Sequence, residues 1–229
     1  MENKQVLIVN LFDKSAFKNS FDQRITEVFE PLSVSYHTVY LENINQITQC
    51  KEYTHLLISG STESAMEENA WYADLARILT LFISAEKSVL GICFGHQFIV
   101  RHLLGKSHVR KSSTPEIGWT DVTLGDNPLF NNIGVFKAGV YHYDEVFDLG
   151  EKFDVIAHSA RCEVHGFQVK GKRIWGVQFH PDFMYQDIFT FADNARKKDP
   201  LANNYFCNTP VSINDFRKND RVFQNWLEI

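Results

Sequence analysis

The stretch Lys87–Gln97, which reads KSVLGICFGHQ, decides how the rest of the chain can be arranged. An apolar run ends at Cys93, and apolar residues then recur at helical spacing. A strand, a sharp turn and a helix make the geometry of a nucleophile elbow, written here with a cysteine. The flanking Gly91 and Gly95 would remove side chains that clash with such a turn. A buried structural cysteine would give the same short pattern, so residues elsewhere must decide between the two interpretations.

The composition is that of an ordinary globular protein. The chain has 229 residues, of which 44% are hydrophobic and 22% charged, with a net charge of -5. The negative charge argues against a nucleic-acid partner or an anionic membrane surface. No apolar run approaches the roughly 20 residues of a membrane span, and no signal-peptide pattern opens the sequence. Because the four cysteines are widely spaced, we expect reduced thiols and a cytoplasmic location.

The first hundred residues alternate between strand and helix patterns. Strands are predicted at residues 6–10, 34–40 and 55–59, and helices near residues 21–29 and 71–82. This alternation predicts an α/β fold, an open and mostly parallel sheet with helices on both faces. Ligands bind such sheets at the carboxyl ends of strands, where Gly60 and Cys93 both fall.

The pattern changes after Gly105. Short strand-like segments at residues 118–124, 134–141, 153–158 and 164–169 predict an antiparallel extension of the sheet. A strand at 172–179 and a helix at 185–198 follow. Since there is no internal repeat or linker, we expect one domain over residues 1–198. Residues 199–229 are predicted to form a C-terminal tail packed on that domain, with a terminal helix.

A cysteine nucleophile needs a base, and His180 ends the strand at 172–179. Asp182 lies two residues beyond and could orient the imidazole ring, although it could also cap the helix that follows. The backbone amides of Phe94 and Gly60 are candidate donors for an oxyanion hole. The other histidines lack metal-ligand spacing, and no glycine-rich phosphate loop occurs, so we expect no metal and no cofactor.

Four motifs together resemble a known family. Residues 91–97 read GICFGHQ and residues 176–182 read GVQFHPD; Glu116-x-Gly118 and His142-x-Asp144-x-Val146 lie between them. This order resembles class I (triad-type) glutamine amidotransferase domains, with their flavodoxin-like sheet, over about residues 6–198. The Gly60-Ser61 pair is similar to the stand-alone, GMP-synthase-like branch, which includes plant γ-glutamyl peptidases.

The resemblance implies that a γ-glutamyl thioester forms on cysteine, ammonia leaves, and glutamate is released. It assigns Cys93 as nucleophile, His180 as base and acid, Asp182 as orienting carboxylate, Gly60 and Phe94 as oxyanion donors, and Gln97, Tyr141 and His142 as substrate-binding positions. The family usually has glutamate where this chain has Asp182, which is one methylene shorter.

Three functions follow as hypotheses. The first is a stand-alone glutamine amidotransferase-like hydrolase that acts on glutamine, with or without a separate ammonia-accepting synthetase as partner. The second is a γ-glutamyl peptidase that acts on γ-glutamyl peptides or conjugates. The third is a catalytically weak binding or regulatory protein with the same fold, against which the intact pair of Cys93 and His180 argues.

Overall fold

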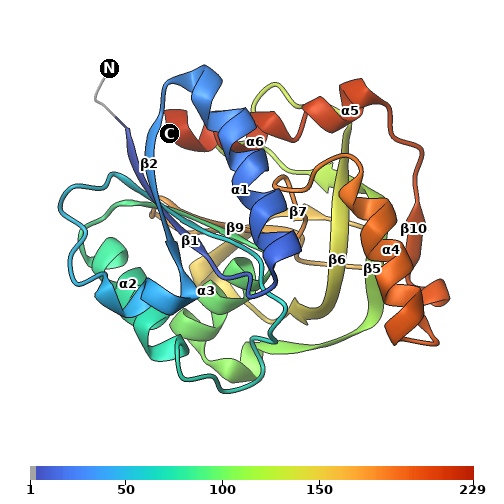
Figure 1. Ribbon diagram of the computed structural model, residues 1–229, viewed down its shortest axis with the longest axis horizontal. Coiled ribbons are helices and arrows are strands. Elements are labelled where there is room, and N and C mark those ends of the chain that lie inside the picture. Colours follow the sequence, from blue (N-terminus) through green and yellow to red (C-terminus); the bar gives the residue numbers. More distant parts are fainter. Residues whose placement is uncertain (1–3) are drawn as a thin grey trace.

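The computed structural model describes residues 4–229, and parallel strands form the centre of its fold (Figure 1). In sheet order these strands are β2 (Ser35–Tyr40), β1 (Gln5–Asn10), β3 (His55–Ile58), β4 (Ser88–Ile92) and β9 (Ile174–Val177). Every neighbouring pair among them is parallel. The strands β3, β4 and β9 are buried along their whole length, as apolar strands covered on both faces must be.

Helices cover both faces of the parallel strands. The helices α2 (Tyr72–Ser84) and α3 (Phe94–Leu104) share a core with Leu7 and Val9 of β1. The helix α1 (Ser15–Phe29) shares the opposite core with Val6 and Ile8. Because successive side chains of a strand point to opposite faces, one apolar strand supplies both cores. The predicted α/β class is confirmed.

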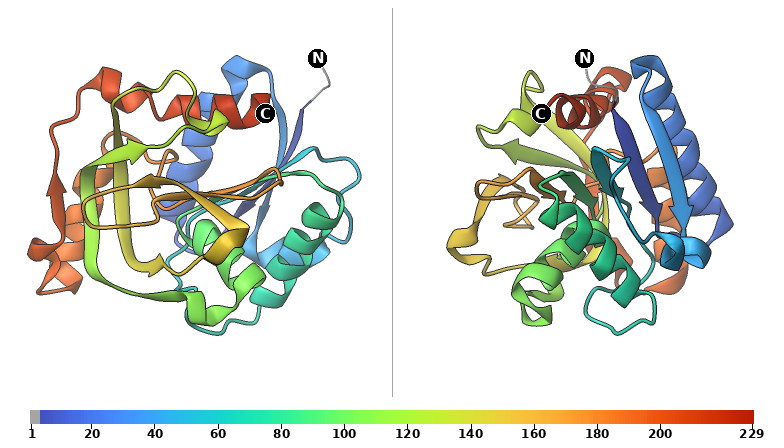
Figure 2. Two further views of the ribbon diagram at one scale, coloured as in Figure 1. Left: turned by 180° about the vertical axis from the view of Figure 1, so that it is seen from behind. Right: turned by 90° about the vertical axis from the view of Figure 1, so that its left-hand side faces the viewer.

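Four more strands extend the sheet in antiparallel pairing: β5 (Val109–Leu124), β6 (Phe136–Val146), β7 (Phe153–His158) and β8 (Gly166–Val169). The extension was predicted, but β5 begins nine residues before the expected 118. The sequence hid this part because residues 110–114 are polar and mostly exposed, and the ladder with β6 is interrupted between Lys111 and Glu116. Figure 2 shows β5 and β6 side by side.

The C-terminal residues contribute the helices α4 (Asp187–Lys198), α5 (Ile213–Arg217) and α6 (Asp220–Glu228). A short strand that the sequence did not reveal, β10 (Phe206–Asn208), pairs with β5. The α6 side chains of Val222 and Trp226 lie fully buried in the same core as α1. Short 3-10 helices occur at Glu30–Leu32, Leu41–Gln46, Lys106–His108, Pro128–Phe130, Gly150–Lys152 and Ala202–Asn204. Within residues 4–229, none of the helices has the length and apolar character to cross a membrane.

Candidate active site

The turn between β4 and α3 has the predicted elbow geometry. Cys93 lies at the turn with φ 49° and ψ −100°, a backbone conformation that residues other than glycine rarely adopt. A Cβ atom on Gly91 would lie 2.5 Å from the carbonyl oxygen of Gly95, and one on Gly95 would lie 2.5 Å from that of Ile58. Only glycine therefore fits at either position, and the strained backbone presents the sulfur at the end of β4.

This strain predicts an inverted order of stability between two variants. The free energy of unfolding of Cys93→Gly should be about 1 kcal/mol higher than that of Cys93→Ala, because glycine adopts a positive φ without strain. At a relaxed position glycine would be the less stable of the two. Urea unfolding of both variants measures the difference, and an alanine variant as stable as the glycine variant would show that the turn stores no strain.

His180 follows β9 and is held on several sides. Its backbone N–H donates to the carbonyl oxygen of Gly139 at 2.8 Å, and its ring stacks on Phe183 with centroids 3.8 Å apart. Its Nδ1 lies 3.1 Å from Oδ1 of Asp182, so the ring donates to that carboxylate. The imidazole faces Cys93, since a Cβ atom on Gly60 would lie 3.0 Å from Cε1 of His180 and 3.7 Å from Cβ of Cys93. The structure thus brings the three residues together in the order thiol, imidazole, carboxylate.

Electrostatics favour the charged form of this histidine. Burial alone would lower the pKa of His180, but the charges of Cys93 and Asp182 and hydrogen bonds to both raise it to about 10. The imidazolium is consequently the resting form at neutral pH. Such a group can give a proton to a leaving amine without first taking one from water.

The raised pKa of His180 predicts how the rate of hydrolysis depends on pH. Because His180 loses its proton only as the pH rises through about 10, hydrolysis should persist through neutral pH and fall on the alkaline side as the general acid is lost. Measuring kcat against pH tests this. In Asp182→Asn, which removes one of the charges that raise the pKa of His180, the alkaline limb should move to lower pH; a limb at the same pH in both proteins would contradict the assignment.

The two predicted oxyanion donors both lie next to the cysteine. Phe94 is the first residue of α3, so its N–H has no partner inside the helix. A Cβ atom placed on Gly60 would lie 3.7 Å from Cβ of Cys93 and 3.0 Å from Cε1 of His180. Within residues 4–229, neither amide has a hydrogen-bond acceptor on the backbone. Ser59 braces the Gly60 loop, since its hydroxyl accepts from Leu11 N–H at 2.8 Å and donates to the Gly60 carbonyl at 2.7 Å.

The three predicted substrate positions are placed differently from one another. The carbonyl oxygen of Tyr141 lies 3.9 Å from the Cys93 sulfur, at the pocket. The Gln97 amide nitrogen donates to the Asp144 carbonyl oxygen and to Gln178, each at 2.9 Å, which leaves only its oxygen to meet a ligand. His142 also lines the pocket, but its two ring nitrogens contact Glu116 and the Asp144 backbone, so neither is free to bind a substrate.

Sequence reasoning missed Gln178. Its Nε2 lies 3.5 Å from the Cys93 sulfur, and the side chain is fully buried. A signal was present, because residues two apart on a strand share a face, and Gln178 precedes His180 by two.

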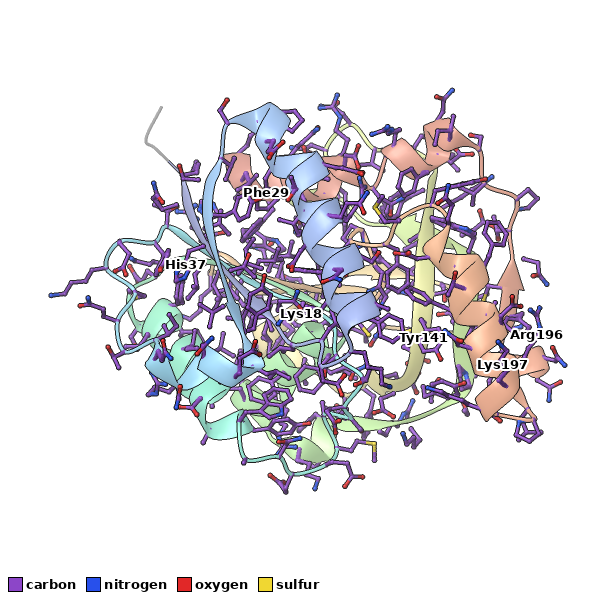
Figure 3. The ribbon with its side chains drawn as sticks, viewed as in Figure 1. Lys18, Phe29, His37, Tyr141, Arg196 and Lys197 are labelled. Atoms are coloured by element: carbon purple, nitrogen blue, oxygen red, sulfur yellow. The ribbon has the colours of Figure 1, made fainter. Side chains whose placement is uncertain are left out.

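A cavity of about 300 Å³ opens beside Cys93. Aromatic side chains form much of its wall: Phe12, Phe17, Phe94, Tyr141, Tyr143, Phe183 and Phe191. Lys14, Lys111 and Lys198 also line it. Figure 3 shows the neighbouring Lys197 and Arg196 on α4, outside this lining. Glu63 and Asp144 line the cavity too, and Asp144 is paired with Lys111 at 2.7 Å, so Lys14 and Lys198 are the lysines that could attract a carboxylate.

The fold defines a class of protein, the open α/β sheets with a cysteine at the elbow after a central strand and a histidine that faces it. The family model for class I glutamine amidotransferases matches residues 15–188, and the chain belongs to this family.

Curated relatives support this family, and a solved structure supports the fold. The chain is 32% identical over 146 residues to one subunit of the glutamine-hydrolysing GMP synthase of Methanocaldococcus jannaschii, covering 63% of this chain and 72% of that one. It is 28% identical over 189 residues to γ-glutamyl peptidase 4 of Arabidopsis thaliana, covering 78% and 72%. By contrast, it spans 24% of the length of a probable GMP synthase from Leptospira interrogans. A glutamine amidotransferase from Thermotoga maritima superposes with a TM-score of 0.77 at 20% identity, over 100% of this chain and 98% of that one.

Proposed function

We propose that this protein hydrolyses γ-glutamyl amides, with glutamine as the first candidate substrate and Cys93 as the nucleophile. The observation that carries the proposal is the strained elbow at Cys93 facing His180, which is bonded in turn to Asp182. A thiol, an imidazole and a carboxylate in this order are the parts that acyl transfer from an amide requires.

The reaction would proceed in two balanced steps. The Cys93 thiolate attacks the γ-carbonyl carbon, and the oxyanion that forms accepts hydrogen bonds from the amides of Phe94 and Gly60. The His180 imidazolium then gives its proton to the amide nitrogen, the C–N bond breaks, and ammonia leaves a thioester behind. Water attacks the thioester while His180 takes a proton from it, which releases glutamate and restores the thiolate.

The release of ammonia suggests a partner enzyme that consumes it. The Methanocaldococcus relative is by name one subunit of a GMP synthase. We propose a separate ammonia-accepting synthetase as the partner of this chain. We also propose that the two proteins act in the cytoplasm.

The cavity favours a second candidate, a γ-glutamyl peptidase. A wall of aromatic rings next to Cys93, with Lys14 and Lys198 also lining the cavity, suits the apolar side chain and free carboxylate of a leaving amino acid. Glutamine releases only ammonia and would leave this part of the cavity empty. The alignment with the Arabidopsis peptidase also covers more of the chain than the alignment with the Methanocaldococcus protein.

A hydrolysis screen separates these functions. Glutamine, γ-glutamylphenylalanine and γ-glutamylalanine would be compared by kcat/KM, with asparagine as the negative control. A preference for glutamine supports the first candidate, and a preference for γ-glutamylphenylalanine supports the second. If none of the γ-glutamyl compounds is cleaved, the proposal fails and a binding protein with this fold is the better account.

Two adjacent lysines on α4 provide a matched test of the peptidase candidate. Lys198→Ala should raise KM for γ-glutamylphenylalanine about threefold, a modest effect because the cation is exposed and screened. Lys197→Ala changes the same charge outside the cavity lining and should leave KM unaltered. Equal KM values in the two variants would remove Lys198 from the leaving-group site.

A further inference from the structure

A buried chain of hydrogen bonds begins at the nucleophile. Nε2 of Gln178 donates toward the Cys93 sulfur at 3.5 Å. Oε1 of Gln178 accepts from Nε2 of Gln97 at 2.9 Å, and the same nitrogen donates to the backbone carbonyl of Asp144 at 2.9 Å. Gln178 is fully buried and Gln97 nearly so. Neither glutamine can rotate without breaking a bond inside the protein.

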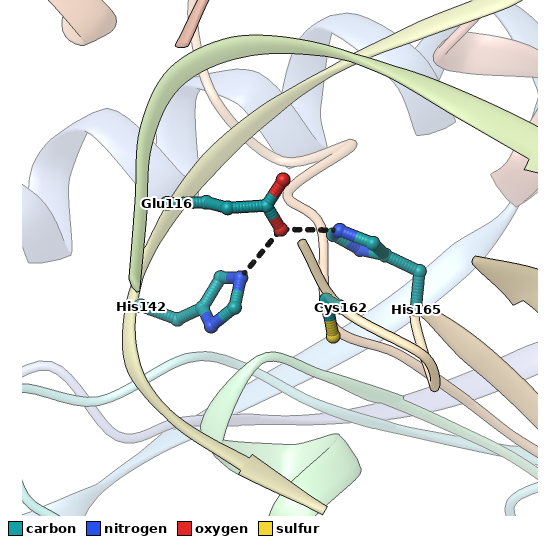
Figure 4. A group of neighbouring side chains, drawn as sticks. All are labelled: Glu116, His142, Cys162 and His165. Atoms are coloured by element: carbon teal, nitrogen blue, oxygen red, sulfur yellow. Dashed lines mark hydrogen bonds and ion pairs between the residues drawn. The ribbon is translucent and has the colours of Figure 1, made fainter. Parts of the chain in front are cut away.

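The chain continues from Asp144 away from the pocket. Nδ1 of His142 lies 3.1 Å from the Asp144 carbonyl oxygen, and since a carbonyl only accepts, this nitrogen carries the hydrogen. Nε2 of His142 faces Oε2 of Glu116 at 3.1 Å, and Nε2 of His165 reaches the same oxygen at 2.7 Å (Figure 4). All three side chains are buried.

Glu116 ends the chain as a fully satisfied carboxylate. Besides the two histidines on Oε2, its Oε1 accepts from the hydroxyls of Ser159 at 2.9 Å and Thr120 at 3.3 Å. Burial alone would raise the pKa of the Glu116 carboxyl, but the hydrogen bonds and charges of the two histidines hold it well below its usual range. Both contacts of His142 are hydrogen bonds only when each of its ring nitrogens carries a proton. Four N–H and O–H donors then surround one anion, and the Cys207 thiol lies 3.9 Å from Oε1 as a fifth. Any N–H or O–H placed on this carboxyl would face another donor.

We propose that Gln178 and Glu116 are positioning residues for the nucleophile. Gln178 holds the sulfur with an amide N–H that favours the thiolate, and Glu116 fixes His142 and, through the Asp144 carbonyl, the two glutamines. The inference rests on the proposed function in that it takes Cys93 as the reacting group. The Glu116-x-Gly118 and His142-x-Asp144 motifs thereby gain a physical role, as the far end of the network that orients the sulfur.

The buried side chains around Glu116 could instead bind a metal ion, which is the competing interpretation. Single donor atoms of Glu116, His142, Cys162 and His165 all lie within 4.8 Å of one another. The contacts of 2.7 and 3.1 Å between imidazole nitrogen and carboxylate oxygen are those of N–H···O hydrogen bonds, and the four donors on Glu116 leave it no lone pair for a cation. We therefore interpret these residues as the far end of the hydrogen-bond network. The test below also measures whether the protein binds a metal ion.

The test follows alkylation of Cys93 by chloroacetamide from about pH 5 to about pH 10, read by mass spectrometry of the Cys93 peptide. Gln178→Leu removes the N–H and should slow alkylation at neutral pH about tenfold, with the profile displaced to higher pH. Glu116→Gln should displace it in the same direction and slow alkylation about threefold. Cys162→Ala, which lies in the cluster but outside the chain of bonds, should react within about twofold of the wild type.

Several results would overturn the proposal. Unchanged profiles in Gln178→Leu and Glu116→Gln, with lower melting temperatures, would leave these residues a merely structural role. One equivalent of bound zinc in the wild type, lost in Cys162→Ala, would replace the hydrogen bonds by metal ligation. If Gln178→Leu or Glu116→Gln does not fold, Gln178→Glu and Ser159→Ala take their places, and unchanged profiles there count equally against it. Because alkylation needs no substrate, displaced profiles in a protein that cleaves no γ-glutamyl compound would refute the proposed function alone.

Discussion

Replacing Cys93 by alanine is expected to lower kcat for γ-glutamyl amide hydrolysis by about 10⁴-fold or more, the largest effect of any single change. Without the sulfur no thioester forms, and only the oxyanion donors and substrate binding remain. Alanine keeps the backbone at φ 49°, so the fold should persist. Measuring glutamine hydrolysis and circular dichroism together checks both points.

Cys50→Ala is the matched control for this variant. Its buried thiol donates to the carbonyl oxygen of Leu81 at 3.5 Å and does not line the cavity beside Cys93. Its loss should leave hydrolysis unchanged. A Cys93→Ala protein with activity near that of the wild type would mean that the elbow holds a structural cysteine.

Asp182→Asn should give the second largest loss, between about tenfold and 10⁴-fold in kcat, with little change in KM. The Asp182 oxygen accepts from Nδ1 of His180 at 3.1 Å, and an asparagine can offer an N–H there that favours the wrong tautomer. The change also removes a charge that raises the pKa of the imidazole. Turnover of the purified variant under saturating substrate measures the effect.

Asp182→Glu is the informative comparison, because it restores the residue usual in the family at the cost of one extra methylene. Asp182 is almost fully buried, so the longer side chain must displace neighbours, and we expect activity within about tenfold of the wild type. Asparagine and glutamate variants with equal activity would mean that Asp182 acts only through packing. The alternative role as a helix cap is wrong, because α4 begins at Asp187 and its cap position is Gln186.

Local patterns in the sequence predicted the elbow and its facing residues. The pattern of Gly91, Cys93 and Gly95 is typical of a sharp turn between a strand and a helix. The second pair, His180 and Asp182, lies only two residues apart just after a strand. The alternation of apolar strands and amphipathic helices likewise predicted the two faces of the sheet. Each of these features depends on residues that are neighbours in the chain or follow one periodicity.

The features that were missed depend on strand pairing between distant segments. Glu116 meets His165 only because β5, β7 and β8 lie in one antiparallel extension, which brings together residues 49 positions apart. Gln97 and Gln178 are 81 positions apart and meet because β4 and β9 are neighbours. Only Gln178 had a local signal, its spacing of two residues from His180. Nothing in the local pattern around Gln97, Glu116 or His165 distinguishes a buried partner from a solvated side chain.

The most direct test of the account is to trap the covalent intermediate. The enzyme would be mixed with glutamine, quenched in acid during turnover, digested and examined by mass spectrometry, with the Asp182→Asn variant used in parallel to slow the release of the acyl group. The account predicts one added γ-glutamyl group on the peptide that contains Cys93, and none in Cys93→Ala. A γ-glutamyl group on Cys50, Cys162 or Cys207 instead, or glutamate released at the wild-type rate by Cys93→Ala, would contradict it.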